Sequence, residues 1–198
     1  MTMLERIQTG LGDIGEALRR PEEFVVRWRD RGAGQHPSPA VFAVLLVNAA
    51  IGLAAYGLSL DLHHGVARMA LAGLKLPLAA GAAWAIALPA LYIVNSSLGS
   101  ELDWSTTALA ALTTVSFGAL AMLASVPINW FFGLALDYPA VRALVNAVIF
   151  TGVGVCMLDV FLRVMKALEP SRSRLYALVW LGLVATIGAE LAVLLSLF

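Results

Sequence analysis

Two acidic residues interrupt long apolar stretches of the chain, and their side chains are the ones best placed to do chemistry there. Asp159 lies in an apolar run over residues 141–165, and Glu190 lies in a second run over 175–198. A charged group at the centre of a membrane helix costs on the order of 2.5–3.5 kcal/mol, so each acid needs a partner or a function. Glu190 has no basic neighbour on its own segment. Glu190 is therefore the better of the two candidates for a proton or ion ligand, although a structural role, with Lys75, Arg142 or outside water as its partner, is the explanation we favour.

Asp159 has a simpler explanation than Glu190. Arg163 follows it by four positions, with the acid first, which is the favourable order for an ion pair on one helix face. This pairing, together with the ability of a long Arg side chain to extend toward the membrane surface, accounts for Asp159 without a catalytic role. We also expect Asp159 and Glu190 to lie near opposite membrane faces, so they do not form a catalytic pair.

Other residue types that support chemistry are scattered. Asp61, His63 and His64 stand close together, but adjacent helical residues point about 100° apart and no third strong ligand is near. The single cysteine, Cys156, lies in an apolar run and is expected to be a small buried residue. The sequence also lacks the nucleophile elbow, the zinc-protease helix and the phosphate-binding glycine loop. We expect no metal, no cofactor and no enzymatic activity.

The composition indicates an integral membrane protein. Of the 198 residues, 60% are hydrophobic and 13% are charged, whereas a soluble domain has about 25% charged residues. The mean hydropathy is +0.85. The formal net charge is zero, which does not favour nucleic acid as a partner. The lipid bilayer is the expected environment.

The apolar segments predict an all-α membrane domain over residues 40–198, because a bilayer core is crossed by roughly 20 apolar residues. We expect five transmembrane helices, at about 40–60, 76–98, 104–134, 141–165 and 175–198. Residues 61–75 are predicted to be a loop that lies partly on the membrane surface.

Small residues recur at helical spacing on the second and third predicted spans, which predicts that these two spans pack as an antiparallel hairpin. On the second span they are Ala80, Ala83, Ala87 and Ala90; on the third they are Thr107, Ala111, Thr114, Gly118, Ala121 and Ser125. Pro89 is expected to kink the second span, since it removes a backbone hydrogen bond. Pro127 is expected to divide the third, because the uncharged run over residues 104–136 has 33 residues, more than one crossing requires.

Residues 1–39 form a polar head and linker. Five apolar residues step by 3, 4, 3 and 4 positions, which is typical of an amphipathic helix: Leu4, Ile7, Leu11, Ile14 and Leu18. Trp28 follows among arginines, a pattern typical of an interfacial anchor. The head is therefore expected either to bind a protein partner or to lie on the membrane surface.

The distribution of basic residues predicts the orientation. Ten of the 13 Lys and Arg residues lie in the head or in the loop after the fourth span, and both fall on one side if there are five spans. The excess of basic residues on cytoplasmic loops places the N-terminus in the cytoplasm and the C-terminus outside. The composition, rich in alanine and arginine, indicates a bacterial inner membrane.

The arrangement resembles the Yip family, the Ypt-interacting-protein domain family of small five-span membrane proteins. The similar features are the end of the head at residues 20–24, Leu88–Tyr92 before a glycine turn at Gly99, then Phe117–Gly118 and Pro127. The resemblance covers most of the chain and consists mainly of hydropathy and turns. It implies a cytoplasmic head that binds a trafficking GTPase in the eukaryotic members.

Two functions follow from these observations. The first is a non-enzymatic membrane scaffold or adaptor, in membrane organisation or trafficking, whose cytoplasmic head binds a partner. The alternative is a small homo-oligomeric channel or transporter that uses Glu190 as its ion or proton ligand, with the kink at Pro89 and the small-residue stripes as supporting features.

Overall fold

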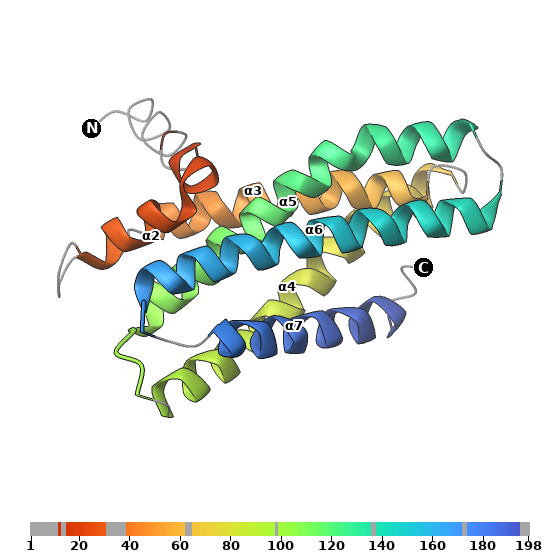
Figure 1. Ribbon diagram of the computed structural model, residues 1–198. Coiled ribbons are helices and arrows are strands. Elements are labelled where there is room, and N and C mark those ends of the chain that lie inside the picture. Colours follow the sequence, from red (N-terminus) through yellow and green to blue (C-terminus); the bar gives the residue numbers. More distant parts are fainter. Residues whose placement is uncertain are drawn as a thin grey trace.

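The computed structural model of the chain describes residues 12, 15–30, 39–61, 65–97, 99–135, 138–171 and 174–194. All the regular structure in these ranges is helical (Figure 1). The labelled helices are α2 (Pro21–Asp30), α3 (Pro39–Leu60), α4 (Val66–Ser97), α5 (Trp104–Ala135), α6 (Pro139–Leu168) and α7 (Arg174–Leu194).

Four of these helices are long and apolar enough to cross a membrane. They are α3, α4, α5 and α6, with 22, 32, 32 and 30 residues. At 1.5 Å per residue, even the shortest reaches about 33 Å, which exceeds the roughly 30 Å of a hydrocarbon core. The expectation of an all-helical, multi-pass membrane protein is therefore confirmed. In α7 the apolar part is the shorter stretch Leu178–Leu191, and the fifth span stays a prediction.

The bundle is organised around α5, which packs against α3 on one side and α6 on another. α4 packs against α3 and α7 (Figure 1). Glycines permit the closest approaches. A Cβ at Gly52 would lie 2.7 Å from the carbonyl carbon of Ala119, and one at Gly57 would lie 2.6 Å from the carbonyl oxygen of Ala72. Any side chain at these two positions would hold the helices apart.

The predicted hairpin of α4 and α5 is wrong. These two helices make few contacts with each other, because α5 contacts α3 and α6 along its length. At Ala87, one of the small residues of α4, the neighbouring helix is α7: Trp180 donates its indole N–H to the Ala87 carbonyl at 3.0 Å. On α5, Gly118 lies against Met157 of α6. Small residues allow close packing, but they do not select which helix comes close.

Two predicted boundaries also need correction. α5 runs from Trp104 to Ala135 as one helix through Pro127, so Pro127 does not divide the third span. α4 begins at Val66 rather than 76, so most of the predicted surface loop is the first part of a long helix. Pro77 and Pro89 both lie inside α4. The turn at Gly99 is present, with a positive φ of 81°.

Polar side chains inside the bundle are paired between helices. Asn48 of α3 donates to the Ser116 carbonyl at 3.2 Å, and Ser116 of α5 donates to the Leu45 carbonyl at 2.6 Å. Asn129 of α5 donates to the hydroxyl of Ser59 at 2.8 Å and to its carbonyl at 3.1 Å. These bonds join α3 to α5 at two levels, where no water competes for them.

Candidate functional site

The described part of the head packs on the bundle instead of projecting from it. Phe24 and Val25 of α2 are fully buried, and both belong to a core that includes Leu109 of α5 and Val160 and Val164 of α6. One face of α2 carries four residues whose successive spacings are 3, 1 and 3 positions, as expected for neighbours on a helix: Pro21, Phe24, Val25 and Trp28. Burial of that face fixes α2 across the ends of α5 and α6 (Figure 1).

Polar contacts hold α2 in the same position. Arg163 of α6 donates to Asp159 at 3.0 Å, so the structure places these two residues in contact. The same guanidinium reaches both carboxylate oxygens of Glu22 at 3.3 Å. At the other end of α2, Arg29 donates to the carbonyl of Leu168 at 2.9 Å. This last bond also satisfies one of the carbonyl groups that the end of a helix leaves unpaired.

The result is a charged surface that we call the α2–α6 platform. Its members are exposed charged side chains of α2, of the two residues directly before it and of the last turns of α6: Arg19, Arg20, Glu23, Arg29, Asp30, Arg163 and Lys166. The neighbouring α4–α5 loop is tied to it, because Ser100 donates to Glu169 at 2.6 Å. Asp103 caps α5 by accepting from the Thr106 N–H at 3.0 Å, which is typical of an N-cap.

The predicted interface residues divide into two groups. Leu4, Ile7, Leu11 and Ile14 lie outside the described residues. Leu18 and Trp28 are half-buried. Trp28 packs edge-to-face on Phe24 with 6.4 Å between the ring centroids, and it borders the core beneath α2. Trp28 therefore contacts the bundle itself. Phe24 and Val25 were not predicted as docking residues. Their helical spacing to Pro21 and Trp28 could have indicated a buried face.

Glu190 lies on an exposed face of α7. Val179, Leu183 and Thr186 precede it at intervals of 4, 3 and 4 positions, and all are exposed. Within the described residues, Glu190 makes no ion pair with Lys75 or Arg142. His63 and His64 lie outside the described residues. No group of three metal-binding side chains was found in the part of the chain that the structure describes.

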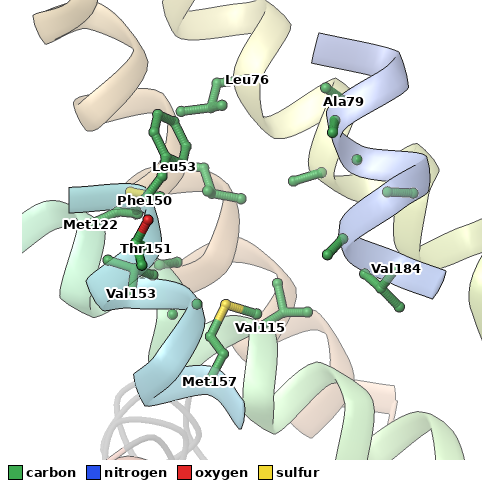
Figure 2. Close-up of a pocket in the computed structure, with 18 of the residues that line it drawn as sticks. Leu53, Leu76, Ala79, Val115, Met122, Phe150, Thr151, Val153, Met157 and Val184 are labelled. Atoms are coloured by element: carbon green, nitrogen blue, oxygen red, sulfur yellow. The ribbon is translucent and has the colours of Figure 1, made fainter. Parts of the chain in front are cut away.

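A groove opens between α6 and α7, and it was not predicted from the sequence (Figure 2). Its volume is about 720 Å³, and residues of all five long helices line it. The walls consist mainly of small and apolar side chains, among them Ala79, Val115, Met157 and Val184. Asn146 and Thr151 of α6 are its polar lining residues.

Aromatic residues mark the end of this groove nearest α2. Trp180 of α7 stacks on Phe161 of α6 at 4.5 Å and 28°, and it meets Trp84 of α4 edge-to-face at 4.9 Å. The α7 residues that line the groove begin at Leu181, directly after this cluster. The three rings thus join α4, α6 and α7 at one level, and the groove lies beyond them, in the half of the bundle away from α2.

Comparisons with known proteins found no match to a family model, to a curated protein or to a solved structure. The function is therefore argued from the two features above, the α2–α6 platform and the groove.

Proposed function

We propose that this protein is a non-enzymatic membrane scaffold or adaptor that presents the α2–α6 platform to a cytoplasmic partner. The observation that supports this role is the docking of α2. Two fully buried residues, Phe24 and Val25, and the contacts of Arg163 and Arg29 hold a short polar helix in a fixed position on the bundle. A charged surface with fixed geometry binds a partner without first being ordered, which lowers the cost of association.

The proposal includes five spans, with the N-terminus in the cytoplasm and the C-terminus outside. α7 has 21 residues, so it reaches about 31 Å, enough for one crossing. Its indole contact with Ala87 lies within the membrane-spanning part of α4. α2 and the end of α6 share one end of the bundle, and both contribute basic residues there. That grouping favours the cytoplasmic side, in a bacterial inner membrane.

A direct test changes the charge of the platform without undocking α2. Arg19 and Lys166 are exposed and make no ion pair or hydrogen bond within the described residues, so Arg19→Glu with Lys166→Glu leaves the buried contacts intact. Arg68→Glu, also exposed but at the opposite end of the bundle, is the matched control.

The readout is in-membrane crosslinking and pull-down of the full chain. We expect the wild-type protein and the Arg68→Glu variant to recover the same partners. The double variant should no longer recover them. A GTPase among them would agree with the resemblance to the Yip family. Equal recovery by all three proteins, or recovery of copies of this chain alone, contradicts the adaptor role.

A channel or transporter is the alternative, and the observation that favours it is the exposed carboxyl group of Glu190 on α7, which has no ion-pair partner among the residues that the structure describes. An ionisable group at membrane depth needs water, a partner or a transported ion. Flux of ions from liposomes that Glu190→Gln reduces would support this function. The apolar lining of the groove offers no continuous polar path for an ion, and for this reason we rank the adaptor first.

A further inference from the structure

We propose that the groove between α6 and α7 binds one anionic phospholipid, with an acyl chain between the helices and the headgroup at the end of the bundle away from α2. This inference uses the membrane-spanning helices and does not depend on the adaptor role. It follows from the length and the lining of the groove (Figure 2), and from a basic residue one helical turn beyond the lining.

The groove has a length and a lining that suit a lipid acyl chain. Along α6 the lining extends from Ala143 to Met157, which corresponds to about 21 Å of helix. The walls are almost entirely apolar, as an acyl chain requires, with Asn146 and Thr151 as the polar lining residues. One leaflet of a bilayer is about 15 Å of hydrocarbon, so an acyl chain from that leaflet can occupy most of this length.

A basic residue lies beside the open end. Arg142 precedes Asn146 by one turn of α6, and Asn146 lines the groove. The Arg142 side chain is half-buried. A phosphate group at the membrane surface would pair with this guanidinium, while the attached chain extends toward Trp84 and Met157.

Asn146 adds a polar contact at the same level. Its side-chain oxygen accepts a hydrogen bond from the Tyr56 hydroxyl at 2.8 Å, which orients the amide. The amide nitrogen then has no partner among the described residues, although Asn146 lines the groove. An ester or phosphate oxygen of a lipid is an acceptor of the kind that this nitrogen needs. A purely apolar occupant would leave the donor unsatisfied at membrane depth, which is costly.

The test uses the full chain in nanodiscs of phosphatidylcholine that contain phosphatidylglycerol with a photoactivatable acyl chain. We expect crosslinks concentrated on lining residues of α4, α6 and α7. Gly154→Phe should remove them, because Gly154 lines the groove and an added Cβ meets nothing within 4 Å. Gly152→Phe is the matched control: its added Cβ also meets nothing within 4 Å, but Gly152 does not line the groove.

The charge requirement is tested by competition. Arg142→Gln should lower the preference for phosphatidylglycerol over phosphatidylcholine by about fivefold, the equivalent of about 1 kcal/mol for one basic residue near the surface. Arg68→Gln, an exposed residue at the same end, should leave it unchanged. If Gly154→Phe does not fold, the wild-type crosslink map and the Arg142→Gln comparison decide.

Three results would overturn the proposal. They are crosslinks spread evenly over all lipid-facing helices, crosslinks that persist in folded Gly154→Phe, and crosslinks from the groove to a second copy of the chain.

Discussion

Arg163 of α6 donates hydrogen bonds to both carboxylate oxygens of Glu22, a residue 141 positions earlier in the chain, at 3.3 Å. The same guanidinium also pairs with Asp159 at 3.0 Å. The Asp159–Arg163 ion pair, predicted within one helix, thus also includes Glu22 of the head. Because the side chains of Arg163 and Glu22 are 44% and 32% exposed, these contacts orient α2, whereas the burial of Phe24 supplies most of the stability of its docking.

The first prediction separates these two contributions. Arg163→Gln should weaken the docking of α2 by no more than about 1 kcal/mol, as is usual for exposed ion pairs. Phe24→Ala should cost about 3–5 kcal/mol, since Phe24 is fully buried and its removal leaves a cavity. Limited trypsin digestion at Arg27 and Arg29 measures the undocked fraction. Cleavage that is equally fast in both variants would show that burial does not dominate.

This docking changes how a deletion of the head is to be interpreted. Removing residues 1–31 exposes Leu109, Val160 and Val164, which α2 now covers. A shortened chain that loses its partners could lose them through this exposed apolar surface. Charge substitutions on the α2–α6 platform avoid that ambiguity.

The second prediction concerns the contact between α3 and α5. Gly52→Ala should destabilise the bundle by about 1–3 kcal/mol, because the added Cβ meets the backbone of Ala119, which cannot move aside like a side chain. Gly152→Ala is the control: its Cβ meets nothing within 4 Å, and Ala gains up to about 1 kcal/mol of helix propensity. Unfolding in mixed micelles with increasing SDS gives both values. Opposite signs are expected, and equal effects would contradict the close approach.

The third prediction tests the hydrogen bonds inside the bundle. Asn129→Ala removes both bonds to Ser59 and should cost about 0.6–1.7 kcal/mol, the range measured for polar pairs in membrane helices. Thr186→Ala is the comparison, since the Thr186 hydroxyl is exposed and its bond among the described residues lies within α7, to the Gly182 carbonyl at 2.9 Å. The same SDS titration applies. A loss for Thr186→Ala as large as that for Asn129→Ala would argue against an interhelical role.

The membrane-spanning helices could be predicted from the sequence, but their neighbours could not. Long apolar runs fix where α3, α5 and α6 lie, because length and hydropathy are local properties. The choice of partner is different, since each helix here is apolar on most faces and shows no polar side that would mark its orientation. The contact of Gly52 with Ala119 depends on two residues 67 positions apart. No periodicity within either helix distinguishes this contact from the predicted hairpin.

In the candidate sites too, features within one helix could be predicted, whereas features formed between helices could not. The Asp159–Arg163 contact was predictable because it lies within one helical turn. The groove was not, because five helices form it and no single stretch of sequence contains its pattern. Glu190 was singled out for its position in an apolar run, and the structure adds that it faces away from the groove and outward on α7.

The last prediction tests the fifth span. α7 is attached to α4 by the Trp180–Ala87 hydrogen bond and to α6 by the stacking of Trp180 on Phe161, and we expect both contacts to hold it across the membrane. In a Cys156→Ser background, single cysteines at Ser171 and Ser196 flank α7. A membrane-impermeant maleimide should label the two sites from opposite sides of inner-membrane vesicles, with Ser171 on the cytoplasmic side. Labelling of both sites from one side would leave four spans and place both ends of the chain together. Glu190 would then lose its position at membrane depth, and the channel alternative would lose its main support.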